Sequence, residues 1–158
     1  MKLYRLTKVK YGKDLSGKGA ELSGGRWNSK GTPMLYTSQS IALATTEIAV
    51  HVPLGILPKG YAIVTYEVPD LAIIEELKEN KLPADFKSIP HSHSTQMIED
   101  KFIIGKRALI LKVPSVVVQG EFNYLINPNH QDQDQLSIEK IEPYEFDERL
   151  FFRQPQNP

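Results

Sequence analysis

Alternating apolar and polar positions predict several short strands along this chain. The clearest alternation runs from Gly60 to Val68 and ends at Pro69, as expected of a half-buried strand. Shorter apolar runs predict further strands at Leu3 to Leu6, Met34 to Tyr36, Arg107 to Val113, Val116 to Val118, Tyr124 to Ile126, Leu136 to Ile141 and Phe146 to Phe152. Most of these strands fall in the second half of the chain.

Two stretches have a helical pattern instead. The first runs from about Ser40 to His51, directly after the hydroxyl residues Thr37 and Ser38, which suit a helix cap, and before a proline and a glycine that stop it. The second runs from about Thr95 to Ile104 and is followed by a glycine. We therefore expect the α+β class: a single mixed domain with a mainly antiparallel sheet flanked by short helices.

The remaining segments predict loops and ends. Lys10 to Asn28 is rich in glycine and polar residues and reads as one long shaped loop, and loops of that length in compact domains are usually functional or disordered. Leu71 to Asn80 and Pro83 to Ser88 are predicted to be short helical or irregular pieces. We expect the domain to span residues 1–153 and residues 154–158 to form a frayed C-terminal tail.

Composition narrows the class of protein. A chain of 158 residues suits one domain, and 41% hydrophobic with 24% charged residues is ordinary for a globular one. Lys plus Arg equals Asp plus Glu, at 19 each, so the overall charge favours no direct nucleic-acid partner. The absence of cysteine excludes disulfides and thiolate chemistry and suits a reducing compartment.

The lack of a predicted signal peptide or membrane span also favours the cytoplasm. The N-terminal residues are followed by lysines rather than by an apolar run, so the sequence predicts no signal peptide. The most apolar stretch, Ile41 to Leu57, is interrupted by Glu47, His51 and Pro53, and therefore cannot supply the ~20 apolar residues of a membrane span. We expect a soluble, cytoplasmic protein without a membrane partner.

Glu47 is the most informative residue that the pattern supplies. At about 100° per residue, the first predicted helix places Glu47 at the border of the apolar face formed by Ile41, Ala44 and Ile48. A carboxylate there loses hydration unless it meets a cation or hydrogen-bond donors. Two interpretations stay open. Either the carboxylate is paired or lies at the rim of a cleft, or the side chain extends to solvent from the edge of the apolar face.

Gly24 and Gly25 put Arg26 behind two residues that permit close backbone approach. The planar guanidinium fork suits phosphate or carboxylate. The segment matches neither G-x-G-x-x-G nor the P-loop pattern. A turn in which Arg26 makes a structural salt bridge to an Asp is therefore the competing interpretation.

Other polar residues carry weaker signals. His91 and His93 stand at alternate positions without a third ligand of convincing spacing, which favours a solvated loop and no metal site. His130 reads as a turn residue. Ser115 lacks a G-x-S-x-G elbow, so its hydroxyl suits hydrogen bonding better than nucleophilic attack.

A series of short stretches, taken in order, resembles the RES-domain family, named for Arg, Glu and Ser, whose members are commonly toxins of bacterial toxin–antitoxin pairs of the Xre/RES type. The most distinctive stretch is Gly24-Gly25-Arg26-Trp27-Asn28. The others are Tyr4-Arg5-Leu6, Leu15-Ser16-Gly17-Lys18-Gly19-Ala20, Leu35-Tyr36-Thr37-Ser38, Leu43-Ala44-Thr45-Thr46-Glu47, Val113-Pro114-Ser115 and Asn123-Tyr124-Leu125-Ile126-Asn127-Pro128-Asn129-His130. The resemblance implies an ADP-ribosyltransferase-like fold and NAD as substrate, with no metal.

The resemblance also assigns roles. Arg26, Glu47 and Ser115 would correspond to the family's Arg, Glu and Ser, and Arg5 and Tyr36 would be further residues of the NAD pocket. Glu47 would hold the nicotinamide ribose or the cation that develops on it, and the two arginines would hold the pyrophosphate. Tyr36 would stack on or wall the nicotinamide, and Ser115 would hydrogen-bond its amide or the ribose. Water or phosphate would then attack.

The same resemblance implies a partner: an antitoxin with a helical DNA-binding part, whose tail blocks the cleft of a toxin that is often dimeric in the complex. One stretch, Met97 to Lys106, departs from the family's pattern of a glycine before the acid and a tryptophan after it. Three alternatives to NAD hydrolysis or phosphorolysis stay open: ADP-ribose transfer to a protein, a non-catalytic nucleotide-binding module, and a structural interaction domain.

Overall fold

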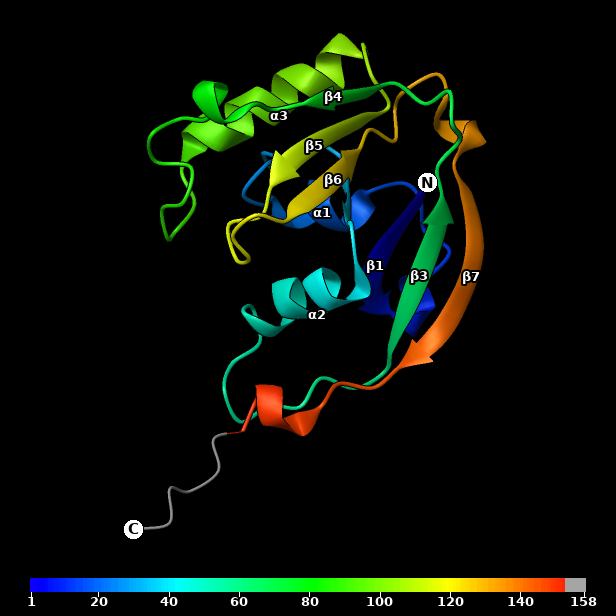
Figure 1. Ribbon diagram of the computed structural model, residues 1–158, viewed down its shortest axis with the longest axis vertical. Coiled ribbons are helices and arrows are strands. Elements are labelled where there is room, and N and C mark those ends of the chain that lie inside the picture. Colours follow the sequence, from blue (N-terminus) through cyan, green and yellow to red (C-terminus); the bar gives the residue numbers. More distant parts are fainter. Residues whose placement is uncertain (153–158) are drawn as a thin grey trace.

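The computed structural model describes residues 1–152, which fold into short helices around one sheet (Figure 1). The strands are β1 (Lys2–Lys8), β2 (Leu35–Ser38), β3 (Tyr61–Glu67), β4 (Ile74–Glu76), β5 (Ile110–Pro114), β6 (Phe122–Ile126) and β7 (Ser137–Tyr144). The α-helices are α1 (Lys18–Ser23), α2 (Ile41–Ala49) and α3 (His93–Gly105). Four 3-10 helices complete the described elements: η1 (Val9–Tyr11), η2 (Glu79–Lys81), η3 (Gln133–Gln135) and η4 (Glu148–Leu150).

Within the described residues the strands form one seven-stranded sheet in the order β4-β5-β6-β2-β1-β3-β7. All neighbouring pairs are antiparallel except β4 and β5. The predicted α+β class with a mainly antiparallel sheet is therefore confirmed. The predicted emphasis on the second half of the chain is wrong, because β1, β2, β3 and β4 all lie in the first half.

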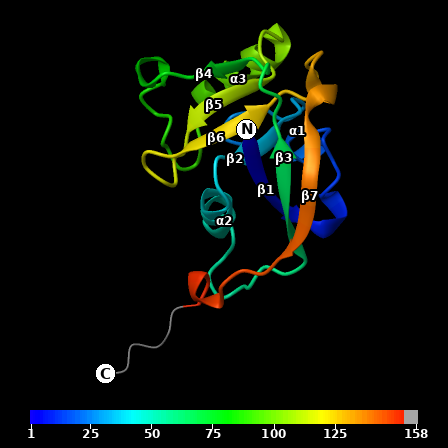
Figure 2. The ribbon, with the colours of Figure 1, turned by 45° about the vertical axis from the view of Figure 1, so that its right-hand side comes forward.

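The junction between β1 and β2 divides this sheet. In residues 1–152 these strands are joined by one partner pair, Tyr4 opposite Ser38, whereas β1 and β3 pair along their whole length. Figures 1 and 2 show β4, β5 and β6 on one side of the junction, and β1, β3 and β7 on the other. Helix α2 lies beside β1 in both views, so it sits close to the junction.

Three apolar clusters hold the described domain together. One lies on one face of β1 and β3, around Leu3, Val64 and Tyr66. A second gathers Trp27, with residues of β5, β6 and α3. The third packs Ala44 of α2 against Leu6 of β1, on the opposite face from Leu3 because successive strand residues point to opposite faces.

Helix α2 confirms the first predicted helix and its start near Ser40 but corrects the residue that caps it. The Ser40 side chain caps the helix by accepting a hydrogen bond from the Leu43 backbone N–H at 3.1 Å. Thr37 and Ser38, which the sequence suggested as the cap, belong to β2 instead. Leu43 and Ala44 are buried.

Four other predictions are wrong. The predicted loop from Lys10 to Asn28 contains η1 and α1, and the irregular stretch from Leu71 to Asn80 contains β4. Val116 to Val118 forms bends rather than a strand, and Phe146 to Phe152 contains η4. The predicted domain end at residue 153 and the predicted tail at 154–158 lie outside the described residues.

Candidate active site around Glu47

Glu47 occupies the last turn of α2, three residues after the buried Ala44 and therefore on nearly the same face of the helix. Its side chain is half-buried. The carboxylate is not left to solvent, because Glu47 Oε1 accepts hydrogen bonds from Ser115 Oγ at 2.8 Å and from Asn123 Nδ2 at 2.6 Å. These contacts match the paired-carboxylate interpretation rather than the solvent-extended one.

Ser115 follows β5 directly, and a turn organises its hydroxyl group. The backbone N–H groups of Val117 and Val118 donate to Ser115 Oγ at 3.1 and 2.9 Å. With its lone pairs occupied, the hydroxyl directs its proton to Glu47. The geometry makes Ser115 a donor to the carboxylate, and it explains why residues 116–118 form a turn and not a strand.

Two backbone carbonyl groups from another segment hold the Arg26 side chain in place. Its Nη1 donates to the backbone oxygens of Phe86 at 2.7 Å and Ser88 at 3.0 Å. Burial lowers the pKa of Arg26, and the negative charge of Glu47 acts in the opposite direction. In residues 1–152 no ion pair involves Arg26, so the interpretation as a structural Arg–Asp salt bridge does not hold.

The backbone of the Arg26 loop is fixed by α3. Thr95 Oγ1 donates to the Arg26 carbonyl at 2.6 Å, and Gln96 Nε2 donates to the Gly25 carbonyl at 2.9 Å. Asp100 lies in the stretch that departs from the family's pattern, and its Oδ1 accepts the Ser29 N–H at 3.1 Å. This stretch therefore helps to hold the Arg26 loop in place through a hydrogen bond from the loop backbone to α3.

Tyr36 joins the same loop from β2. Its hydroxyl donates to Asn28 Oδ1 at 2.8 Å and accepts the Trp27 N–H at 3.2 Å. Burial raises the pKa of Tyr36, so the phenol is neutral at physiological pH. A Cβ added at Gly25 would stand 2.8 Å from the Tyr36 hydroxyl oxygen, which explains why the loop needs glycine there.

Arg5 lies away from these residues. It alternates with Tyr4 and Leu6, whose side chains pack on the α2 side of β1. Its Nη1 donates to the Asp14 carbonyl at 3.2 Å, and its charge lowers the pKa of Tyr66, which burial raises. The structure thus joins Glu47 to Ser115 directly and puts Arg5 on the other face of β1, and the pKa of Arg26, which burial lowers, responds in the opposite direction to the charges of Glu47 and Tyr36.

Asn123 and Ser38 are functional candidates that were not singled out from the sequence. Asn123 binds Glu47 directly, and Ser38 Oγ donates to Asn123 Oδ1 at 2.7 Å. Both belong to stretches that carry the family resemblance. Their positions opposite one another in β2 and β6 follow only from the strand pairing.

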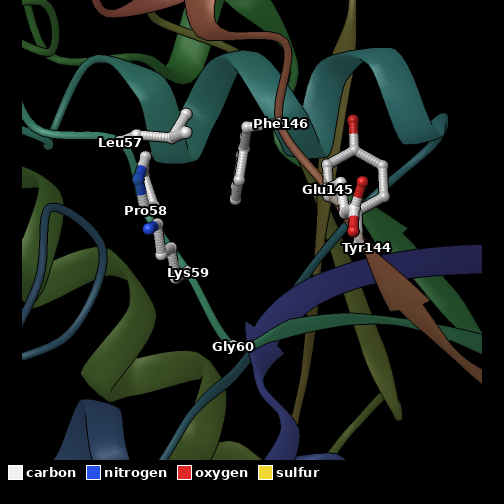
Figure 3. Close-up of a pocket in the computed structure, with 7 residues that line it drawn as sticks. All are labelled: Leu57, Pro58, Lys59, Gly60, Tyr144, Glu145 and Phe146. Carbon is white, nitrogen blue, oxygen red and sulfur yellow. The ribbon is translucent and has the colours of Figure 1, made fainter.

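A pocket of about 340 Å³ is lined by none of the predicted site residues. Figure 3 shows Leu57, Pro58 and Lys59 along one side, Tyr144 and Glu145 along the other, and Phe146 between them. The pocket borders α2 through Tyr144, whose hydroxyl is 2.6 Å from Thr45 Oγ1.

The sequence makes His91 and His93 candidate metal ligands and predicts His130 as a turn residue. His91 and His93 are exposed, and His93 Nδ1 lies 3.2 Å from Gln96 Oε1. His130 is buried, and its Nδ1 accepts the Asp132 N–H at 3.1 Å, which fits the predicted turn. Residues 1–152 contain no grouping of three potential metal ligands.

Taken together, these residues belong to a small α+β domain that carries a helical carboxylate held by two donors and an arginine on a glycine-rich loop. The RES domain family model matches residues 2–147. The chain belongs to this family.

Relatives support the assignment over most of the chain. A protein of Sphingobium sp. (strain YBL2), named "Prs ADP-ribosylating toxin", is 37% identical over 139 residues, covering 87% of this chain and 86% of the relative. A protein of Photorhabdus laumondii subsp. laumondii, named "Toxin Res", is 36% identical and covers 84% and 85% of the two chains.

A solved structure shares the fold. It is titled as the crystal structure of the M. tuberculosis MbcT–MbcA toxin–antitoxin complex, and the matched chain superposes with a TM-score of 0.69 at 21% identity, covering 95% of this chain and 86% of that one. None of the helices in residues 1–152 has the length and apolar character needed to cross a membrane.

Proposed function

We propose that this protein is the toxin of a type II toxin–antitoxin system and that it cleaves the nicotinamide–ribose bond of NAD in the cytoplasm. The toxin assignment is supported by the names of the Sphingobium and Photorhabdus relatives. The use of NAD is supported by the word "ADP-ribosylating" in the first of these names, because NAD is the usual donor of ADP-ribose.

The observation that carries the proposal is the environment of Glu47. Cleavage of the glycosidic bond builds positive charge on the ribose, as in glycoside hydrolysis. A carboxylate held in advance by two donors stabilises that charge without reorganising. Both donors bind Glu47 Oε1, and the other oxygen, Oε2, receives no hydrogen bond from residues 1–152. Oε2 is therefore free to meet the ribose 2′-hydroxyl or the developing cation.

Arg26 and Tyr36 complete the proposed NAD site. Arg26 uses Nη1 for its two carbonyl partners, which leaves Nη2 and Nε to bind the pyrophosphate by charge-assisted hydrogen bonds. The Tyr36 ring would wall the nicotinamide. Ser115 acts mainly through Glu47. A pyrophosphate role for Arg5 stays a prediction from the family resemblance.

Two reactions are possible, and they differ in the group that accepts ADP-ribose. Hydrolysis or phosphorolysis would release ADP-ribose or ADP-ribose 1″-phosphate, whereas transfer would modify a protein. The name of the Sphingobium relative favours transfer as a second candidate. In either case Glu47 stabilises the same cation, so the site residues are shared.

The decisive experiment incubates purified protein with NAD, with and without phosphate, and with the Prs protein as a candidate acceptor, and identifies the products by mass spectrometry. We expect nicotinamide release that falls by about 10²- to 10³-fold in Glu47→Gln, by analogy with the loss of one preorganised stabiliser. Undiminished release by folded Glu47→Gln would contradict the role of Glu47. Saturable NAD binding without release would support a non-catalytic module, and no NAD affinity would support an interaction domain.

The proposed partner is an antitoxin with a helical DNA-binding part that occludes this site. Support comes from the structural neighbour, which is titled as a toxin–antitoxin complex. Co-expression of the protein encoded beside this gene should give a co-purifying complex with suppressed NAD turnover. Size-exclusion chromatography with light scattering would test the homodimer that the family resemblance implies.

A further inference from the structure

Asn123 connects the Glu47 carboxylate to the junction of the sheet. It lies in β6, opposite Ser38 of β2 and opposite Val113 of β5. Asn123 Nδ2 donates to Glu47 Oε1 at 2.6 Å, and Asn123 Oδ1 accepts from Ser38 Oγ at 2.7 Å. A continuous chain of hydrogen bonds therefore runs from β2 through β6 to α2.

The chemistry of Ser38 and Glu47, the groups at the two ends, sets the direction of these hydrogen bonds. A carboxylate accepts hydrogen bonds and cannot donate, so the amide must present its NH₂ end to Glu47. The Ser38 hydroxyl donates to the other end of the amide, which makes the reversed amide unfavourable because a carbonyl oxygen would then face the carboxylate. Ser38 is buried, so water competes poorly for this hydrogen bond.

Ser115 and Asn123 reach the same oxygen from different strands. Both donate to Oε1, and each is held by a further contact: Ser115 by the turn amides and Asn123 by Ser38. Fixing one oxygen from two directions fixes the plane of the carboxylate. The plane determines where Oε2 points.

We propose that Asn123 and Ser38 are positioning residues that fix the plane of the Glu47 carboxylate and aim Oε2 at the NAD ribose. This inference rests on the proposed NAD cleavage and extends it to two residues that do not touch substrate. A misplacement of the order of 1 Å at a reacting group costs on the order of 10²-fold in rate. Asn123→Ala should therefore lower kcat by about 10- to 100-fold and leave the KM for NAD within about threefold, while Ser38→Ala lowers kcat by less.

The test is a double-mutant cycle on nicotinamide release. If Asn123 acts through Glu47, Asn123→Ala should cost about 10- to 100-fold in the wild-type background but less than about threefold in the Glu47→Gln background. The matched control is Thr37→Val, which removes a buried hydroxyl from the same strand pair. Thr37 Oγ1 donates to the Tyr124 carbonyl at 2.6 Å and not to the Glu47 group, so kcat should be unchanged.

The outcomes separate this inference from the proposed function. Equal losses in both backgrounds, or a rise in KM with unchanged kcat, would overturn the positioning role while leaving NAD cleavage in place. Wild-type protein that releases no nicotinamide would overturn both. Circular dichroism verifies folding of each variant, and if Asn123→Ala does not fold, the cycle with Ser38→Ala decides by the same criteria.

Discussion

Glu99 should make the stability of this protein fall as pH rises, and Glu99→Gln should remove that dependence. The Glu99 side chain is 0% exposed in α3, and within residues 1–152 neither of its carboxylate oxygens has a hydrogen-bond partner. Burial raises the pKa of Glu99 well above its ordinary value, and the negative charges of Glu75 and Asp100 raise it further. The folded protein therefore holds this proton at pH values where an unfolded glutamate has lost it.

The sign and size follow from proton linkage. Above the unfolded pKa of about 4.3, the folded state binds more protons than the unfolded state, so the free energy of unfolding falls with rising pH. The fall is at most about 1.4 kcal/mol per pH unit and continues until the folded pKa is reached. From pH 4.3 to 7 the ceiling is about 3.7 kcal/mol, reached if Glu99 stays protonated throughout.

Urea denaturation of wild type and Glu99→Gln between pH 4.5 and 8 measures this effect, with the fluorescence of the single, buried Trp27 as the signal. The difference between the two unfolding free energies should grow with pH in favour of Glu99→Gln, because glutamine does not titrate. The control is Glu145→Gln, at an exposed carboxylate, which should follow wild type. Parallel curves for wild type and Glu99→Gln would refute the reasoning.

Three further substitutions test the glycine-rich loop, Arg26 and Arg5. Gly25→Ala puts a methyl group 2.8 Å from the Tyr36 hydroxyl oxygen and should lower kcat/KM by about 10²-fold. The control Gly19→Ala, whose added Cβ meets no described atom within 4 Å beyond its chain neighbours and its own helix backbone, should stay active in the same nicotinamide assay. Arg26→Lys loses the planar fork and should raise the KM for NAD by about tenfold or more, measured by steady-state kinetics. Arg5→Ala should raise that KM less than Arg26→Lys, because Arg5 lies on the other face of β1; a larger rise would restore its pyrophosphate role.

Local pattern predicted the long regular elements and missed the short ones. The alternation of residues 60–68 became β3 (Tyr61–Glu67), and the helical pattern of residues 95–104 became part of α3 (His93–Gly105). Strand β4 covers only Ile74–Glu76 and exists through its parallel pairing with β5. A strand of three residues carries too little alternation to be recognised.

The valines at 116–118 show local hydrogen bonds from the backbone to a side chain overriding strand propensity. β-Branched residues favour strands, yet the amides of Val117 and Val118 turn back to the Ser115 hydroxyl. Pairing these residues in a sheet would remove both donors and free the lone pairs of that hydroxyl. The turn is the conformation that directs the Ser115 proton to Glu47.

The sequence predicted only those features of the site that depend on a single helix or strand. The helical period put Glu47 at the border of an apolar face, which requires a partner but does not identify it. Its partners Ser115 and Asn123 are 68 and 76 residues away in sequence, and Asn123 meets Glu47 only because β6 pairs with β2 beside α2. A slip of one residue in that pairing would turn the Asn123 side chain to the other face. The strand register, which sequence periodicity does not determine, therefore decides whether Asn123 joins Ser115 in holding the Glu47 carboxylate.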